Sequence, residues 1–389
     1  MTRIFLSTWG QNDNIGDSIL RRGLLRSFQG MDGVDLHVHV GRREPGEPND
    51  EGYLTAVGLN GTEILYDSTL DWLKAASASV CAKRTIMVLP AGEIVYARFG
   101  KSLMAAGNLV LALAPRARGG TAMQVGAGVR MSSVGDKVRS GARRVRGIPA
   151  IPFLDRASRR SMAMVAWRDT ATRNAFGTGD VLPDWAFGEG ADPQDGGLGA
   201  APAQRKLMAV TTRWDRGDLG DDKIAQLRGL ADRHDLAIQV YSQVRRDREH
   251  SERMARILHP GTDAILFENQ THAEWEHQVR ALHRESAIVA GDRAHALIIG
   301  ATEGAIPLAI SNWTTEKPVR TVRTGGISVP SDSESSMASI EAYVADQMAD
   351  SESIERPVND ARQQIAKARI RMRAIAINGE PALVAGGGA

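Results

Sequence analysis

An arginine and a histidine two positions apart are the side chains of this sequence best placed to do chemistry. Arg293 and His295 follow a short apolar run at residues 287–290 and precede helix-like spacing at 296–302, after which a second apolar run covers 306–310. Strand, helix and strand in this order predict a βαβ unit. The two side chains then fall at the carboxyl edge of a parallel sheet, where open α/β folds bind ligands.

The pair suits an anionic ligand that gains or loses a proton. The Arg293 guanidinium offers a planar fork to a carboxylate or phosphate, and the His295 imidazole can hold or deliver a proton near neutral pH. Both lie beside a helix N-terminus, whose free N–H groups favour an anion. The simpler interpretation is an arginine that caps a loop and a histidine bonded to a backbone carbonyl.

The elements that must position this pair form two series of alternating strands and helices. In the first half, strands are expected at residues 3–8, 35–40, 63–66, 85–89, 121–129, 161–167 and 179–182. In the second half they are expected at 206–212, 236–241, 264–267, 287–290 and 306–310, separated by helices. Strands that alternate with helices of roughly 10 to 15 residues indicate parallel sheets.

A length of 389 residues is more than one core usually needs, so two domains are expected. We predict an α/β protein with two Rossmann-like domains whose parallel sheets face each other across a cleft. The first domain, on the acceptor side, covers residues 1–187, and a Gly-, Ala-, Pro- and Asp-rich linker covers 188–204. The second domain, on the donor side, covers 205–356, and a helix with a disordered tail covers 357–389.

A polar turn near the start of the chain resembles the turn that holds the arginine and histidine pair. Residues 9–18 join the first strand to a helix expected at 19–28, and Asp17 or Ser18 is expected to cap that helix. The turn matches neither the dinucleotide-binding glycine fingerprint nor a P-loop.

Composition narrows the class of protein. The content of 42% hydrophobic and 24% charged residues is typical of a globular enzyme, and a net charge of +2 gives no reason to expect nucleic acid binding. The single cysteine, Cys81, excludes an intrachain disulfide and a cysteine-based zinc site. No cluster of histidines and carboxylates has metal-ligand spacing. The first residues lack a signal peptide, and no apolar stretch is long enough to span a membrane, so a cytoplasmic protein is expected.

A basic segment at residues 130–146 stands apart from this pattern. It carries six basic residues against one acidic residue, Asp136, and has no firm periodicity. One interpretation is a solvated loop without a partner. The other is attraction to a diphosphate-bearing substrate or to an anionic lipid surface, which would bring the protein to the inner face of the membrane.

Four separated motifs together resemble the polysaccharide pyruvyl transferase family. They are Asn-Ile-Gly-Asp at 14–17, Arg-Asp at 168–169 with Pro-Asp-Trp-Ala-Phe at 183–187, Thr-Thr-Arg at 211–213 with Tyr-Ser-Gln at 241–243, and Arg-Ala-His at 293–295 with Ala-Ile-Pro at 305–307. The resemblance spans residues 4–317. The sequence departs from the family pattern at Ala305, where a glycine is expected, and at Lys317, which follows its strand at a longer distance.

The resemblance implies a fold similar to the two-domain glycosyltransferase architecture called GT-B. It also implies transfer of a pyruvyl group from phosphoenolpyruvate to a pair of sugar hydroxyls, which forms a cyclic ketal and releases phosphate. The acceptor would be a cell-surface polysaccharide or its lipid-linked precursor. Phosphoenolpyruvate is the donor substrate, and no cofactor is expected.

Roles follow for the residues that match the motifs. His295 is the expected general acid, Arg168 and Arg293 clamp the donor, and Asp17 serves as base or orienter on the acceptor side. The remaining expected substrate-binding residues are Asn14, Gly16, Arg213 and Lys317. Arg168 has a simpler alternative role, an ion pair with Asp169 or Asp184 at the domain boundary. Glu93 lies in a turn after the strand at 85–89, where the family pattern has more glycines. It is interpreted as a surface residue, and contact with the acceptor sugar is the alternative.

Two other functions remain open at this stage. A GT-B glycosyltransferase with a nucleotide-sugar donor would need the same sheets and the same anion site, together with a pocket for the base and ribose. A non-catalytic glycan-binding or scaffold protein would keep only the fold.

Overall fold

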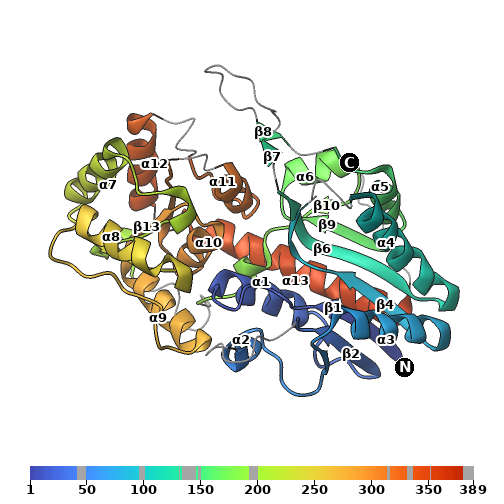
Figure 1. Cartoon of the computed structure of the whole chain (residues 1–389). Coiled ribbons are helices and arrows are strands. Elements are labelled where there is room, and N and C mark those ends of the chain that lie inside the picture. The colour runs from blue at the N-terminus through green and yellow to red at the C-terminus, as the bar shows by residue number, and fades with distance from the viewer. Residues whose placement is uncertain are drawn as a thin grey trace, which may run out of the picture.

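Two parallel sheets form the frame of the molecule (Figure 1). The computed structural model describes residues 1–41, 50–95, 101–130, 132–133, 146–147, 150–191, 200–312, 316–330, 336–350 and 352–379. Residues 192–199 of the predicted linker, residues 131 and 134–145 of the basic segment and residues 380–389 of the predicted tail lie outside this range. The two described ends of the basic segment form a short antiparallel pair, β7 (Ser132–Ser133) with β8 (Arg146–Gly147).

The first sheet has the strand order β10-β9-β6-β4-β1-β2-β3, with β5 paired to β6, and every pairing is parallel. Its strands are β1 (Thr2–Ser7), β2 (Val34–His39), β3 (Ile64–Tyr66), β4 (Arg84–Leu89), β5 (Gly92–Ile94), β6 (Thr121–Val129), β9 (Met164–Trp167) and β10 (Asp180–Val181). Its helices are α1 (Ile15–Leu25), α2 (Asp50–Ala56), α3 (Thr69–Ala82), α4 (Lys101–Leu113), α5 (Phe153–Arg160) and α6 (Thr170–Phe176), with the 3-10 turns η1 (Ala114–Arg118) and η2 (Trp185–Gly188).

The second sheet has the parallel order β12-β11-β13-β14. Its strands are β11 (Leu207–Thr211), β12 (Ala237–Val240), β13 (Ser286–Gly291) and β14 (Ile306–Ala309). Its helices are α7 (Asp221–Arg233), α8 (Arg248–Leu258), α9 (His272–Glu285), α10 (Ala294–Thr302), α11 (Glu316–Arg323) and α12 (Met337–Ala349), with the 3-10 turns η4 (Pro202–Gln204), η5 (Trp214–Arg216) and η6 (Arg245–Asp247).

The central strands of the first sheet are buried on both faces, as their unbroken apolar runs predict. Successive side chains of a strand point to opposite faces. Ile4 and Leu6 of β1 therefore join the core beneath α1, whereas Phe5 packs on the other side against Trp72 of α3, with ring centroids 6.0 Å apart. The core beneath α1 continues into the second half of the molecule.

The last helix of the chain, α13 (Glu355–Asn378), returns to the first sheet (Figure 1). It buries Val358, Ile365 and Ile375, and Arg84 of β4 donates a hydrogen bond of 2.9 Å to the Ile375 carbonyl. None of the helices within the described residues combines the length and the apolar character needed to cross a membrane.

Three local predictions differ from the structure. The predicted strand at 264–267 makes only one bridge, between Tyr241 and Ile265, because the N–H of Phe267 bonds to the Ser242 hydroxyl instead of a strand. The strand predicted at 161–167 begins later, at Met164, because Ser161 ends helix α5. The predicted caps Asp17 and Ser18 are wrong: Asn14 caps α1 by accepting from the Gly16 N–H at 3.1 Å.

Candidate functional site

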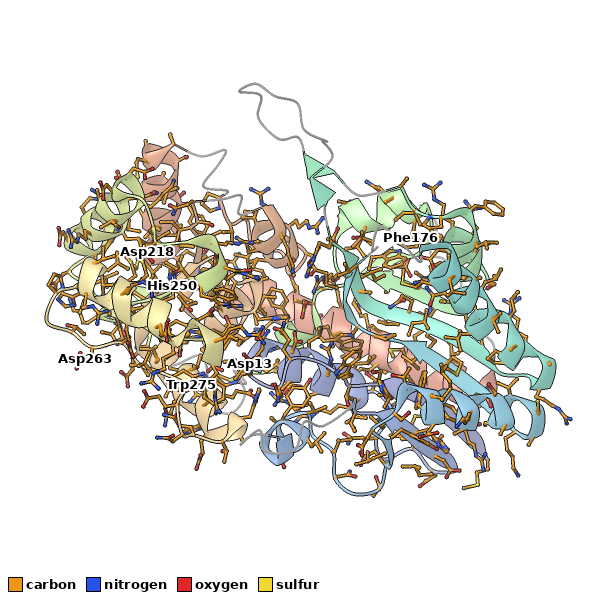
Figure 2. All side chains as sticks on the ribbon, in the orientation of Figure 1. Asp13, Phe176, Asp218, His250, Asp263 and Trp275 are labelled. Carbon is orange, nitrogen blue, oxygen red and sulfur yellow. The ribbon has the colours of Figure 1, made fainter. Side chains whose placement is uncertain are left out.

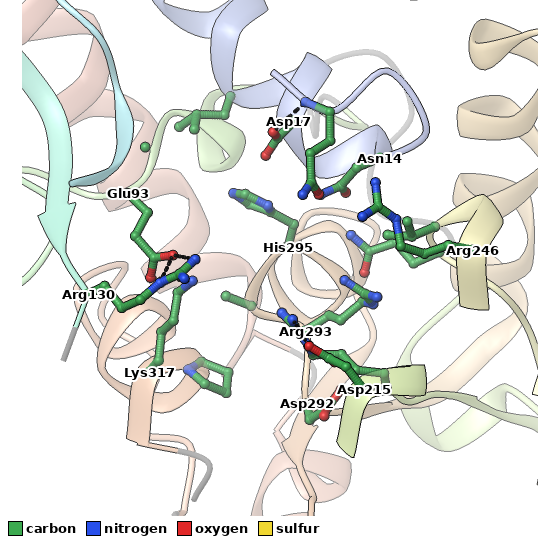
Figure 3. Close-up of a pocket in the computed structure, with 18 of the residues that line it drawn as sticks. Asn14, Asp17, Glu93, Arg130, Asp215, Arg246, Asp292, Arg293, His295 and Lys317 are labelled. Carbon is green, nitrogen blue, oxygen red and sulfur yellow. Dashed lines mark hydrogen bonds and ion pairs between the residues drawn. The ribbon is translucent and has the colours of Figure 1, made fainter. Parts of the chain in front are cut away.

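A pocket of about 340 Å³ lies between the two sheets, where the carboxyl ends of their strands face each other (Figure 3). Eight basic side chains line it against four acidic ones. The basic residues are Arg21, Arg130, Arg168, Arg213, Arg216, Arg246, Arg293 and Lys317, and the acidic residues are Asp17, Glu93, Asp215 and Asp292. Asn14 and His295 also line the pocket. The excess of positive charge favours an anionic ligand.

Arg293 comes from the second sheet, where it is the residue that immediately precedes α10. Its guanidinium forms an ion pair with Asp247, a fully buried carboxylate that also accepts from the Trp214 N–H at 3.2 Å. Burial raises the pKa of Asp247, and the opposing effect of Arg293 does not cancel this. The Nε of Arg293 is buried and makes no hydrogen bond to any described residue, so one donor of this group is unused.

Arg168 comes from the first sheet, directly after β9, and is 4% exposed. It lies over Gly128, where an added Cβ would come within 2.7 Å of the Arg168 Nε. Its nearest carboxylate oxygen, on Asp184, is 3.8 Å away. Within the described part of the chain, its Nε and one terminal nitrogen have no hydrogen-bond partner. A buried guanidinium with unused donors is costly unless a ligand completes its hydrogen bonds.

His295 lies in the first turn of α10, two residues after Arg293, and faces the same Asp184 carboxylate as Arg168. Its Nε2 is 3.6 Å from the Asp184 carboxylate, which is fully buried. Burial alone raises the pKa of Asp184, but His295 and then Arg168 lower it more strongly, so the net pKa falls below its ordinary value. The ionised Asp184 carboxylate is therefore shared by His295 and Arg168.

The first turn of α1 packs against His295 and forms part of the pocket wall. An added Cβ at Gly16 would lie 2.3 Å from the His295 Nδ1, so Gly16 supports the imidazole from behind instead of lining the pocket. Asp17 does line the pocket, and its carboxylate accepts from the Gln11 N–H at 2.9 Å. Figure 3 shows Asp17 and His295 on neighbouring turns.

Glu93 links two basic residues on the far side of the pocket (Figure 3). Its carboxylate lies 2.9 Å from the Lys317 amine and accepts from the Arg130 Nε at 2.7 Å. Burial opposes ionisation of Glu93, yet Lys317 and Arg130 lower its pKa to about 2. Burial lowers the pKa of Lys317 to about 8, and Arg168 adds to this shift. The interpretation of Glu93 as a surface residue is therefore wrong, although its place after β4 could have indicated the site.

The Arg213 guanidinium already has a carboxylate partner. Its guanidinium makes two bonds of 2.8 and 2.7 Å to Asp215, and that hydrogen bonding lowers the pKa of Asp215 to about 2. The Arg213 N–H also donates to Asp292 at 3.1 Å. Arg213 thus lines the pocket as predicted, but its planar fork already holds a carboxylate.

Several pocket residues have no counterpart among the predicted site residues. Arg246 of the second half forms two bonds of 2.7 Å to Asp13 of the first half, which is labelled in Figure 2. Trp214 is 52% exposed on the pocket wall. Both follow strand ends of the second sheet, and that position was their only signal in the sequence.

Two histidines outside the four motifs are buried. His250 is 1% exposed and its Nε2 lies 2.8 Å from the Thr212 hydroxyl (Figure 2). His272 is fully buried, and its Nε2 lies 2.7 Å from the Ser18 hydroxyl of α1, which joins the two halves. Among the described residues, no group of three or more His, Cys, Asp or Glu side chains could hold a metal ion.

Comparison with known proteins supports the fold. No protein-family model matches the sequence, and no curated protein matches it significantly. Among solved structures, the chain is similar to UDP-GlcNAc 2-epimerase from Neisseria meningitidis bound to UDP-GlcNAc, with 11% identity, a TM-score of 0.53 and coverage of 97% of this chain and 99% of that one. It is also similar to the MnaA protein of S. aureus in complex with UDP, with 12% identity, a TM-score of 0.51 and coverage of 97% of each chain. The predicted architecture is confirmed: the chain has the GT-B fold, two Rossmann-like domains that face each other.

Proposed function

We propose that this protein is a transferase that binds a phosphate-bearing donor in the pocket and passes a group from it to a sugar hydroxyl. One observation carries the proposal: Arg168 and Arg293, from opposite sheets, line the same pocket as His295, and both keep hydrogen-bond donors that no described residue uses. Guanidinium groups bind phosphates and carboxylates in a fixed geometry. The donor substrate is therefore expected to accept hydrogen bonds from both arginines.

His295 is the proposed proton carrier. Its Nε2 lies 3.6 Å from the Asp184 carboxylate, which can hold the ring in place for proton transfer. Asp17 lines the same pocket from the first turn of α1 and is placed to orient or deprotonate an acceptor hydroxyl. A donor held by the arginines and an acceptor held near Asp17 would meet beside His295.

The structural comparisons favour a nucleotide sugar as the donor. The two similar structures contain UDP-GlcNAc and UDP, respectively. Trp214 supports this candidate from the pocket itself, because an indole that is 52% exposed offers a flat face on which a nucleobase could stack. Arg293 would then bind the diphosphate at the N-terminus of α10.

The site residues themselves favour phosphoenolpyruvate as a second candidate. This donor carries a carboxylate and a phosphate on three carbons, and Arg168, Arg293 and Lys317 together could hold both groups. In the expected reaction, the methylene carbon takes a proton from His295 and the neighbouring carbon bonds to both sugar oxygens while its bond to phosphate breaks. Of the two hydroxyl protons, one replaces the proton that His295 gave and the other leaves with phosphate.

A donor screen tests the proposal. The protein is incubated with sugar acceptors and either phosphoenolpyruvate or a panel of nucleotide sugars, and released phosphate or nucleoside diphosphate is measured. The true donor should also stabilise the protein, by about 2.7 kcal/mol at a hundred times its dissociation constant.

His295→Gln should lower turnover by roughly 100-fold without changing the melting temperature, because it removes the proton carrier from a folded site. His259→Gln, a change at an exposed histidine, is the matched control. Full turnover in His295→Gln, or no stabilisation by any donor of either class, would contradict the proposal.

A further inference from the structure

A second surface of the molecule has an unusual arrangement of apolar side chains. On α4 and α5, which pack side by side on the first sheet's outer flank (Figure 1), six large apolar residues face solvent. We call them the α4–α5 apolar face: Leu103 (80% exposed), Met104 (37%), Val110 (62%), Leu113 (43%), Phe153 (76%) and Leu154 (38%). Isolated exposed apolar residues are common, but a group of this kind on two adjoining helices marks an interaction surface.

Helix α4 differs from an ordinary surface helix because it buries small side chains and exposes large apolar ones. Its fully buried positions are the small residues Ala105 and Ala112, whereas Leu103 and Val110, seven residues apart and so on one side of the helix, point outward. A helix that served only the core would bury its large side chains. The outward stripe therefore has a different use.

An apolar hollow adjoins this face. It has a volume of about 220 Å³ and lies between α3, α4 and η1. Val110 and Leu111 form one wall, and Val80 and Cys81 form the opposite one. Because Val110 belongs both to the hollow and to the α4–α5 apolar face, the two form one continuous apolar region.

Positive charge lies beside this face, on η1 and α5. Arg116 and Arg118 follow α4, and Arg156 and Arg160 lie on α5, and all four are exposed. Across residues 101–130 and 150–160 the sequence contains one acidic residue, Asp155, which is buried in an ion pair with Arg159 at 2.6 Å. No exposed carboxylate in these two described ranges offsets the four arginines.

We propose that the α4–α5 apolar face docks on an anionic lipid surface, with an acyl chain entering the hollow. Apolar side chains that insert at the level of the headgroups, beside arginines that pair with lipid phosphates, are the features of interfacial membrane binding. Pairing with a second copy fits less well, because a two-fold interface would bring two sets of arginines together. The inference is independent of the donor in the proposed reaction.

Vesicle sedimentation tests the proposal. The full chain should bind vesicles that contain phosphatidylglycerol and bind neutral phosphatidylcholine vesicles at least about tenfold more weakly, because each basic side chain near an anionic surface contributes roughly fivefold. The double variant Leu103→Ser/Phe153→Ser should lose at least about tenfold in affinity, because two large apolar groups no longer insert. The control is Ile370→Ser, at a residue of α13 that is 68% exposed. This variant should bind the vesicles as tightly as the unchanged protein does.

The single cysteine allows a fluorescent probe to report whether lipid enters the hollow. Cys81 lines it and is exposed, so an environment-sensitive fluorophore can be attached there alone. Its emission should shift to the blue with anionic vesicles, and the Leu103→Ser/Phe153→Ser variant should abolish the shift. Absence of vesicle binding, or unchanged binding by the double variant, overturns the proposal. So does a dimer in light scattering that the double variant converts to a monomer, because this identifies a second copy as the occupant.

Discussion

At the scale of single residues, the arginines of the pocket fall into two groups. Arg213 and Arg246 each hold a carboxylate through two short bonds, to Asp215 and Asp13. Arg168, in contrast, keeps buried donors without a described partner. Residue type alone therefore does not identify a ligand-binding arginine, because a neighbouring carboxylate can already satisfy it.

Lys317 gives the site a pH dependence. A lysine is charged below its pKa, and burial followed by the charge of Arg168 lowers this pKa from 10.5 to about 8. The affinity for an anionic donor should therefore be highest below pH 7 and fall about tenfold as the pH rises through 8, as one charged contact is lost. Calorimetric titration of the donor at several pH values measures this.

Lys317→Arg is the informative variant, since a guanidinium stays charged over this range. Its donor affinity should stay level between pH 7 and 9, whereas Lys74→Arg, a change at an exposed lysine, should leave the decline in place. An equal decline in Lys317→Arg would assign the pH dependence to another group.

At the scale of elements, the site depends on two helix N-termini that approach each other. Helix α1 begins after its Asn14 cap, and α10 begins after Arg293. The first turns are so close that Gly16 of α1 has no room for a side chain beside His295 of α10. The position of the imidazole is thus set by packing between helices of different sheets.

Gly16→Ala tests this packing. Alanine favours a helix over glycine by about 1 kcal/mol, but its Cβ would lie 2.3 Å from the His295 Nδ1, so the clash should prevail. We expect kcat to fall at least about tenfold and the melting temperature to drop. The control is Gly107→Ala in α4, where nothing lies within 4 Å and a small gain in stability is expected. Normal turnover in Gly16→Ala would show that His295 need not hold this position.

At the scale of the whole molecule, buried charges hold the two halves together around the pocket. Arg22 of α1 donates to Glu276 of α9 at 2.9 and 2.7 Å, and to Glu189 at 3.0 Å. All three side chains are largely buried. A shared anion site between two sheets requires such a connection, since its walls belong to different halves of the chain.

Arg22→Met should lower the free energy of unfolding by about 3 kcal/mol, because two buried carboxylates lose a partner. Urea denaturation measures this value. Arg371→Met removes an exposed ion pair with Asp180, at 3.1 Å, and should cost less than about 1 kcal/mol. Equal losses in the two variants would mean that Arg22 does not join the halves.

The sequence by itself determined the alternation of strands and helices, because apolar periodicity is local. It placed the strand at 121–129 with its observed bounds, and it put Arg168 and Arg293 after strands, in positions that line one pocket. Open α/β folds bind ligands at the carboxyl ends of their parallel strands, so position along the chain indicated that Arg168, Arg293 and His295 lie near a binding site.

Only the tertiary structure decided which of these residues have partners. Glu93 meets Lys317, Arg213 is neutralised by Asp215, and His272 is buried against Ser18. Each outcome depends on how segments far apart in the chain, or side chains across one turn, approach in space. Hydrophobic periodicity carries no information on that approach, since it reports which face of an element is buried and not what lies opposite.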